Sequence, residues 1–235
     1  MILYYIRHAQ SGNNALYEST GSSKGRSDDP SLTLTGEAQA HQVAEWLASL
    51  PEPPPLHRHS DLRPSHIYCS LMKRAVQTGS VIATRLGLPL QGVPDLHETG
   101  GIYLDEDMEE DHSVRPGLGR SQLENLHRGL VLPPEVGESG WYNRPFEEHT
   151  ERVARARRLV TDLLERHAGT SDRVVLVSHG TFYNYFLAEL WHLEAGKEWW
   201  LRLNNTGVTR LEFHSDVRVL AYANRTAHLP PELIT

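Results

Sequence analysis

The chain has 235 residues, of which 39% are hydrophobic and 23% are charged, so an ordinary folded domain is the first expectation. A formal net charge of −7 argues against broad binding to nucleic acids or to anionic membranes, although it leaves room for a local basic pocket. The single cysteine, Cys69, excludes an internal disulfide framework, and Arg7 ends the apolar N-terminal run before a signal-peptide core forms; we therefore expect a cytoplasmic protein.

The beginning of the chain predicts a strand, a loop and a helix. Residues 2–6 form a short apolar run that is typical of a buried strand, and a Gly/Ser-rich loop follows through Ser31. We expect a helix from about Gly36 to Ser49, because apolar residues recur on one face of it: Ala40, Val43, Ala44 and Leu47.

A proline-rich loop and a second strand and helix come next. The prolines between Pro51 and Pro64 cannot continue a helix, and we interpret His57-Arg58-His59 within them as solvated surface residues. The elements expected after this loop are a strand at 66–69, a helix at 71–86 and a short edge strand at 89–92.

The second half of the chain predicts an insertion, followed by further alternation of helices and strands. Periodicity fades between residues 100 and 144, and we interpret this segment as a cap or lid over the core; its acidic run, Asp105 to Asp111, is typical of a solvated face. The elements expected beyond it are a helix at 146–167, a strand at 173–177, a helix at 181–192, and two strands at 207–213 and 217–222 that could form a hairpin.

This alternation indicates an α/β fold. The run Val174 to Val177 is apolar without a break, as expected of a central parallel strand that is covered on both faces. We therefore predict a three-layer α/β/α sandwich with a largely parallel central sheet, formed by residues 1–235 as a single domain.

Polar residues follow three of the predicted strands directly. The first strand ends in Arg7-His8, the second in Ser70 with Arg74 one turn into the next helix, and the third in Ser178-His179-Gly180. In open α/β sheets, ligands bind beyond the carboxyl ends of the strands. The sequence thus predicts one pocket that contains two arginines and two histidines.

These residue types suit a phosphoryl group. Arginine side chains bind phosphate oxygens in a bidentate manner, and a neutral histidine can act as a nucleophile toward phosphorus. The two arginines would repel a dication, and no carboxylate has the spacing of a zinc motif near either histidine, so we expect no metal ion and no cofactor. A cysteine-phosphatase loop is a weaker alternative, because only four residues separate Cys69 from Arg74 and none of them is glycine.

Four segments resemble the motifs of the histidine phosphatase superfamily, the phosphoglycerate-mutase-like group, in the order found in that family. They are Arg7-His8-Ala9-Gln10-Ser11-Gly12-Asn13-Asn14, Leu32 to Ala40, Ser70 to Thr78, and Ser178-His179-Gly180. The resemblance covers nearly the whole chain and implies a phosphoglycerate-mutase-like fold. It departs from the family pattern at Ala9, where glycine is usual.

The resemblance also implies a set of site residues. His8 is then the nucleophile that forms a phosphohistidine intermediate, and Arg7, Arg74 and His179 hold the phosphoryl group, with Asn14 as a further contact. The family's proton donor is an acidic residue after the second-arginine helix, and Glu98 lies there. One carboxyl group can protonate the leaving group and then activate water. An ordinary solvated loop carboxylate is the other interpretation of Glu98.

We therefore expect a metal-independent phosphatase that hydrolyses a phosphate monoester of a small molecule. A phosphoglycerate-type mutase is an alternative, although mutases of the family continue their acid motif with Arg-His-Tyr-Gly where this chain has Thr99-Gly100-Gly101. A catalytically weak phospholigand-binding homologue is another, and Ala9 keeps it open. The sequence leaves the oligomeric state and the leaving group undetermined.

Several residues could contact a leaving group. Arginines in the insertion could bind a carboxylate or a second phosphate, although scattered arginines are more often surface residues, and two aromatic pairs could flank an apolar group, although such pairs more often pack in cores. The arginines are Arg115, Arg120, Arg128 and Arg144, and the pairs are Trp141-Tyr142 and Trp199-Trp200.

Overall fold

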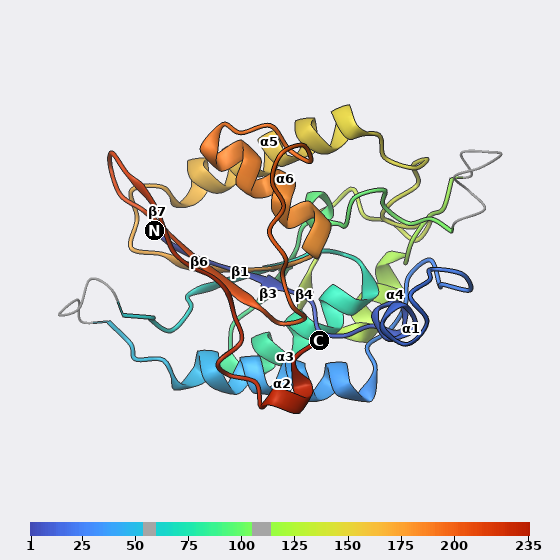
Figure 1. Ribbon diagram of the computed structural model, residues 1–235, viewed down its shortest axis with the longest axis horizontal. Helices are drawn as coiled ribbons and strands as arrows, with labels where there is room; N and C mark the ends of the chain where they lie inside the picture. The colour runs from blue at the N-terminus through green and yellow to red at the C-terminus, as the bar shows by residue number, and fades with distance from the viewer. Residues whose placement is uncertain (54–59, 105–113) are drawn as a thin grey trace.

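The computed structural model describes residues 1–53, 60–104 and 114–235 (Figure 1). In these residues, one sheet has the strand order β4-β3-β2-β5-β1-β6-β7. Its strands are β1 (Ile2–Arg7), β2 (His66–Cys69), β3 (Leu90–Gly92), β4 (Leu130–Val131), β5 (Arg173–Ser178), β6 (Val208–Phe213) and β7 (Arg218–Arg225). The strands from β4 to β1 pair in parallel, whereas β6 and β7 form an antiparallel hairpin at one edge.

Helices cover both faces of this sheet. The helices are α1 (Gly12–Thr20), α2 (Leu34–Ser49), α3 (Lys73–Leu86), α4 (Arg120–Leu126), α5 (His149–His167) and α6 (Gly180–Trp191), with short 3-10 turns η1 (Pro94–Leu96) and η3 (Pro231–Leu233). Figure 1 shows α2 and α3 on one side of the sheet and α5 and α6 on the other. The predicted three-layer sandwich and the predicted hairpin are therefore confirmed.

The side chains of the central strands alternate between two apolar layers. On β1, Tyr4 and Ile6 pack in the layer with α2 and α3, whereas Leu3 and Tyr5 pack in the layer with α5 and α6. The run Val174 to Val177 on β5 alternates in the same way. An unbroken apolar run is thus explained by a strand with a hydrophobic core on each face.

The structure forms the helix α1 where the sequence predicted a loop through Ser31, so that prediction was wrong for residues 12–20. A capping box begins this helix: the Ser11 side chain accepts from the backbone N–H of Asn14, and the Asn14 side chain accepts from the backbone N–H of Ser11. None of its residues is buried. An exposed helix has no apolar face, so the periodicity that predicted the other helices is missing here.

The described part of the segment from 100 to 144 packs into the core. It contains α4 and β4, and β4 extends the sheet by pairing with β3. Leu123 and Trp141 are buried in the same layer as α2 and α3. The acidic run from Asp105 to Asp111 and the group His57-Arg58-His59 lie outside the described residues. The cap or lid remains a prediction, as does the single domain.

The strand register brings the three predicted polar clusters to one edge of the sheet. Arg7 pairs with Ser178 between β1 and β5, and Cys69 pairs with Val177 between β2 and β5. The residues that follow these strands therefore emerge side by side at their carboxyl ends. Among the residues described, no helix is long and apolar enough to cross a bilayer.

Candidate active site

Arg74 joins the two histidines that follow β1 and β5. Its Nε atom lies 3.1 Å from His8 Nε2, and its Nη2 atom lies 3.3 Å from His179 Nδ1. The rings of His8 and His179 are 5.0 Å apart between centroids. All three side chains are buried. The structure thus brings together three of the residues that the sequence singled out, from three different strand ends.

The hydrogen bonds of the two imidazoles fix which nitrogen carries the proton. His8 Nδ1 lies 2.7 Å from the carbonyl oxygen of Ala9, which can only accept, so Nδ1 carries the proton and Nε2 keeps its lone pair toward Arg74. In His179, Nδ1 accepts from Arg74, and Nε2 therefore donates to Ser70 Oγ at 2.9 Å. Both rings present a lone pair to the same guanidinium group.

Burial and the arginines keep both rings neutral. Burial lowers the pKa of His8 well below its ordinary value of 6.5, and the positive charges of Arg74 and Arg7 lower it further. Burial and the charge of Arg74 lower the pKa of His179 well below the same value. An unprotonated His8 Nε2 is a nucleophile at neutral pH.

Arg7 approaches this cluster from β1. Its Nη1 atom donates to the carbonyl oxygen of Leu203 at 2.7 Å, while its Nε atom is buried without a hydrogen-bond partner among the described residues. Burial lowers the pKa of Arg7, and the negative charge of Glu98 acts in the opposite direction. A buried N–H without a partner is a donor that an anion can use.

Glu98 caps the beginning of α6. Its Oε2 atom accepts from the backbone N–H of Thr181 at 3.0 Å, and its Oε1 atom accepts from the N–H groups of Phe182 and Thr99, both at 2.8 Å. Glu98 is half-buried. The carboxylate is therefore held firmly, unlike an ordinary solvated loop carboxylate.

The segment before Glu98 is fixed from α5. Arg155 Nη1 donates to the carbonyl oxygens of Asp95 and His97, and its other nitrogens form a buried bidentate pair with Glu147 at 2.6 and 2.7 Å. A guanidinium group that holds two backbone carbonyls restrains the segment they belong to. The sequence analysis did not identify Arg155, because an arginine on a helix carries no local sign that it is buried.

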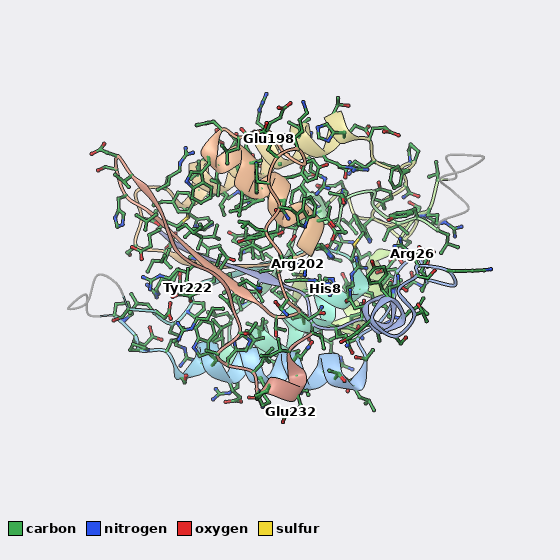
Figure 2. The ribbon with its side chains drawn as sticks, viewed as in Figure 1. His8, Arg26, Glu198, Arg202, Tyr222 and Glu232 are labelled. Atoms are coloured by element: carbon green, nitrogen blue, oxygen red, sulfur yellow. The ribbon has the colours of Figure 1, made fainter. Side chains whose placement is uncertain are left out.

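Arg7 and Glu98 line a pocket of about 330 Å³. The start of α6 contributes Gly180 and Thr181 to it, and residues 200–204 form another wall. Figure 2 labels Arg202 of that wall and His8, and the pocket residues Arg7 and Gly180 directly precede His8 and follow His179 in the sequence. The pocket thus opens beside the Arg74–histidine cluster.

Two asparagines support the segment after β1. Asn205 Nδ2 donates to the carbonyl oxygen of His8 at 2.9 Å and lies 3.3 Å from Asn14 Oδ1. Asn14 Oδ1 also accepts from the backbone N–H and the hydroxyl of Ser11. Asn14 is therefore linked to the His8 backbone through the side chain of Asn205, and it also belongs to the cap of α1.

Asp29 is a carboxylate of this site that the sequence analysis missed. Its Oδ1 atom accepts from the backbone N–H of Lys73 at 2.9 Å and lies 3.7 Å from Arg74 Nη1. Its Oδ2 atom is buried and lacks a hydrogen-bond partner in the described part of the chain. Burial raises the pKa of Asp29 to about 6, although Arg74 acts to lower it. Asp29 thus orients Arg74 from the side opposite the histidines.

Two other sequence alternatives have a clear outcome. Cys69 is fully buried, and burial raises the pKa of its thiol, so it does not offer the thiolate that a cysteine phosphatase needs. Ala9 is also fully buried, and its backbone N–H donates to Thr78 Oγ1 at 3.0 Å. Its φ is not in the left-handed region, so alanine fits there without backbone strain.

The candidate leaving-group residues separate into two groups. The pair Trp141-Tyr142 is buried in the core, whereas Trp200 is half exposed and lines the pocket. Arg115 lies against Asp28, Arg120 donates to backbone carbonyls of its own segment, and Arg144 lies over the ring of Tyr142. Beside Arg7, the pocket is lined by Arg202, which the sequence analysis did not consider.

Comparison with known proteins identifies the family of this chain. Residues 3–226 match the family model of the histidine phosphatase superfamily, branch 1. Curated relatives include a probable phosphoglycerate mutase of Yersinia pestis, which is 29% identical over 232 residues that make up 97% of this chain and 94% of the relative. A protein of the same name from Yersinia pseudotuberculosis matches equally.

Solved structures show the same fold over nearly the whole chain. A phosphoserine phosphatase of Entamoeba histolytica in complex with 3-phosphoglyceric acid superimposes with a TM-score of 0.62 at 22% identity, covering 97% of this chain and 99% of that one. A mycobacterial glucosyl-3-phosphoglycerate phosphatase gives a TM-score of 0.61 at 22% identity, covering 96% and 99%. The fold is thus phosphoglycerate-mutase-like, and the chain belongs to branch 1 of the histidine phosphatase superfamily.

Proposed function

We propose that this protein is a phosphatase that hydrolyses a small phosphate monoester through a phosphohistidine at His8. The observation that carries the proposal is the state of the His8 ring. Its Nδ1 proton is held by the Ala9 carbonyl group, so Nε2 keeps a lone pair, and burial lowers the pKa enough to keep the ring neutral. Arg74 lies against that same nitrogen, where the phosphoryl oxygens of a substrate would lie.

In the first step, His8 Nε2 attacks the phosphorus atom. The N–P bond forms as the P–O bond to the leaving group breaks, and the leaving oxygen takes a proton from Glu98, which enters this step protonated and leaves it as the carboxylate. Arg74 and Arg7 donate to the phosphoryl oxygens and stabilise the charge of the transition state, and the negative charge of the phosphoryl group favours protonation of His179 at Nδ1, which then donates as well. Arg74 exchanges its histidine contacts for these oxygens, and the unpartnered Arg7 Nε supplies a further donor.

In the second step, a water molecule attacks the phosphorus of the phosphohistidine. Glu98 accepts the proton of this water, the N–P bond breaks, and inorganic phosphate leaves with the ring neutral again. A carboxylate has about four lone-pair positions. Oε1 uses its two for Thr99 and Phe182, whereas Oε2 uses one for Thr181, so the transferred proton is carried on Oε2.

The pocket beside Glu98 supports hydrolysis and suggests where the leaving group lies. Arg202 and Trp200 are exposed at its wall, and Glu98 is only half-buried, so water can reach the carboxylate. A mutase must keep water away from its phosphohistidine. We propose that the leaving group lies against residues 200–204.

The test is a phosphate-release panel of sugar phosphates, phosphoglycerates, nucleotides and phosphopeptides, run for the wild type, for His8→Ala and for His41→Ala. His41 is an exposed histidine on α2 and serves as the matched control. We expect release by the wild type and by His41→Ala, and none by His8→Ala. Rapid acid-free quenching with labelled substrate should trap phosphoryl label on the wild-type protein. Turnover by His8→Ala would refute the proposal.

The name of the Yersinia relatives favours a mutase as the second candidate. Incubation with 3-phosphoglycerate, followed by phosphorus NMR, separates the two. A phosphatase releases inorganic phosphate, whereas a mutase interconverts the phosphoglycerate isomers with little release. Sustained isomerisation without phosphate release would replace hydrolysis by the mutase reaction. Tight binding of a phosphoester without either reaction would indicate a phospholigand-binding protein.

A further inference from the structure

A second group of histidines lies at the other end of the same strands. His66 begins β2, His167 ends α5, and Asp172 directly precedes β5. Because the sheet is parallel here, the carboxyl ends of β2 and β5 face the pocket, and their amino ends carry this group. A six-residue strand such as β5 spans roughly 17 Å, which separates the two groups of histidines.

The chain between α5 and β5 brings Asp172 back to His167. Thr170 Oγ1 donates to the carbonyl oxygen of His167 at 2.8 Å and accepts from the backbone N–H of Asp172 at 3.0 Å. Gly169 has a φ of 77°, a conformation that favours glycine. The short loop is therefore organised before any ligand binds.

The three side chains converge on one point. His167 Nδ1 lies 2.9 Å from Asp172 Oδ2, and His66 Nδ1 lies 3.9 Å from Asp172 Oδ1. One ligand atom from each residue lies within 4.8 Å of the others. Zinc bonds of about 2.0–2.1 Å in a tetrahedral site place ligand atoms roughly 3.3 Å apart. The two measured contacts reach different oxygens of Asp172 and lie on either side of that spacing, and the 4.8 Å limit means that the ligand atoms have to move closer together to close the site.

The surroundings suit a bound cation. Without an ion, His167 Nδ1 donates to Asp172 Oδ2 and Tyr68 Oη donates to His167 Nε2 at 2.9 Å. A metal ion at Nδ1 would move the ring proton to Nε2, where Tyr68 Oη can accept it and fix the ring, as neighbouring groups of zinc ligands do. The Arg173 guanidinium group faces away, because it donates to the carbonyl oxygens of Arg63 and Ser171. The Ser65 hydroxyl lies 2.9 Å from His66 Nδ1. When that nitrogen binds an ion, the hydroxyl can donate to the carbonyl oxygen of Arg173 instead.

We propose that His66, His167 and Asp172 form a binding site for a divalent transition-metal ion of the zinc type. Two neutral imidazoles and one carboxylate are the ligand set that such ions prefer, and a water molecule completes a tetrahedron. The His66 and Asp172 side chains are 34% and 28% exposed, which leaves a path for the ion to enter. The ion would tie the end of α5 to β2 and β5, away from the reacting atoms.

Calorimetric titration of metal-free protein with zinc chloride at neutral pH tests the site. The wild type should bind one equivalent and melt at a higher temperature when loaded, and Co²⁺ in its place should give the visible absorption of a tetrahedral complex. His66→Ala and Asp172→Asn should each lower the affinity at least tenfold while phosphatase turnover stays unchanged.

Two controls separate this site from other histidines. His214 also lies beside a carboxylate, 3.3 Å from Glu212, and is more exposed than His66, so His214→Ala should bind zinc like the wild type. His8→Ala should also bind normally, because the active-site histidines lie at the opposite end. In the wild type, NMR should show zinc-dependent chemical-shift changes of the His66 and His167 rings. This measurement does not depend on whether the variants fold. No saturable binding, or unchanged affinity in both site variants, would overturn the proposal.

Discussion

The two ends of the central parallel strands β1, β2 and β5 carry the same residue type in opposite surroundings. At the carboxyl ends, His8 and His179 are buried against Arg74, which lowers their pKa values and makes the region attractive to an anion. At the amino ends, His167 lies against Asp172, which makes the region attractive to a cation. The comparison shows that a histidine takes its chemistry from its charged neighbours more than from its place on the sheet.

The largest expected effect comes from breaking the arginine bridge at the carboxyl ends. Arg74→Lys keeps the positive charge but cannot reach both histidines or bind two phosphoryl oxygens. We expect kcat/KM for phosphate release to fall by about 10²–10³-fold, the cost of losing a transition-state donor. Arg173→Lys is the matched control at the amino ends and should keep full activity. Equal losses in both variants would mean that stability, and not phosphoryl binding, explains the effect.

A slightly smaller effect is expected from Glu98→Gln, which keeps a side chain of the same shape at the start of α6 but cannot transfer a proton. We expect kcat to fall by about 10²-fold for alkyl phosphates, since general acid catalysis contributes this much, and clearly less for aryl phosphates with good leaving groups. Steady-state kinetics on both substrate types measures the difference. A uniform loss for both would assign Glu98 to capping alone.

The pH dependence of stability should differ between the two ends. The folded pKa of His8 lies below its unfolded value of 6.5, so the unfolded chain binds the proton first and stability is lost as the pH falls below 6.5. Hydrogen bonding to His167 lowers the folded pKa of Asp172 below 3.8, so its contribution is lost only as the pH falls below that value.

Urea unfolding of the wild type and of His8→Asn at several pH values tests this difference. Below pH 6.5, the free energy of unfolding of the wild type should fall by about 1.4 kcal/mol per pH unit relative to the variant, because the folded variant has one fewer histidine that must stay neutral. Parallel stability curves would show that the pKa of His8 is the same in the folded and the unfolded protein, and that burial does not keep the ring neutral below pH 6.5.

The smallest effect is expected at the amino ends. Tyr68→Phe removes the hydroxyl group that contacts His167 Nε2 without changing the apolar packing of the ring. We expect a loss of about 1 kcal/mol in the free energy of unfolding, together with zinc affinity lower by about tenfold. Tyr183→Phe, which loses a contact to Thr209 elsewhere in the core, should show the stability loss alone. Equal zinc affinity in both variants would remove Tyr68 from the proposed site.

Much of the fold could be predicted from the sequence, because its central elements are buried and alternate in a regular way. The strands at 2–6, 66–69 and 173–177 were each apolar and each ended in a polar cluster, so their order implied that Arg7, His8, Arg74 and His179 would meet. The helix α1 escaped this reasoning, since an exposed helix held by a capping box has no apolar stripe.

What the sequence determined by itself is therefore the α/β class and the convergence of the arginines and histidines at one edge, because both follow from local patterns and parallel strands. Only the tertiary structure decided which charges face which rings. Asp29 meets Arg74 across 45 positions of sequence, and His66 meets His167 across 101, and neither pairing leaves a local pattern. Hydrogen bonds between distant segments fix the proton positions, which set the chemistry at each end of the sheet.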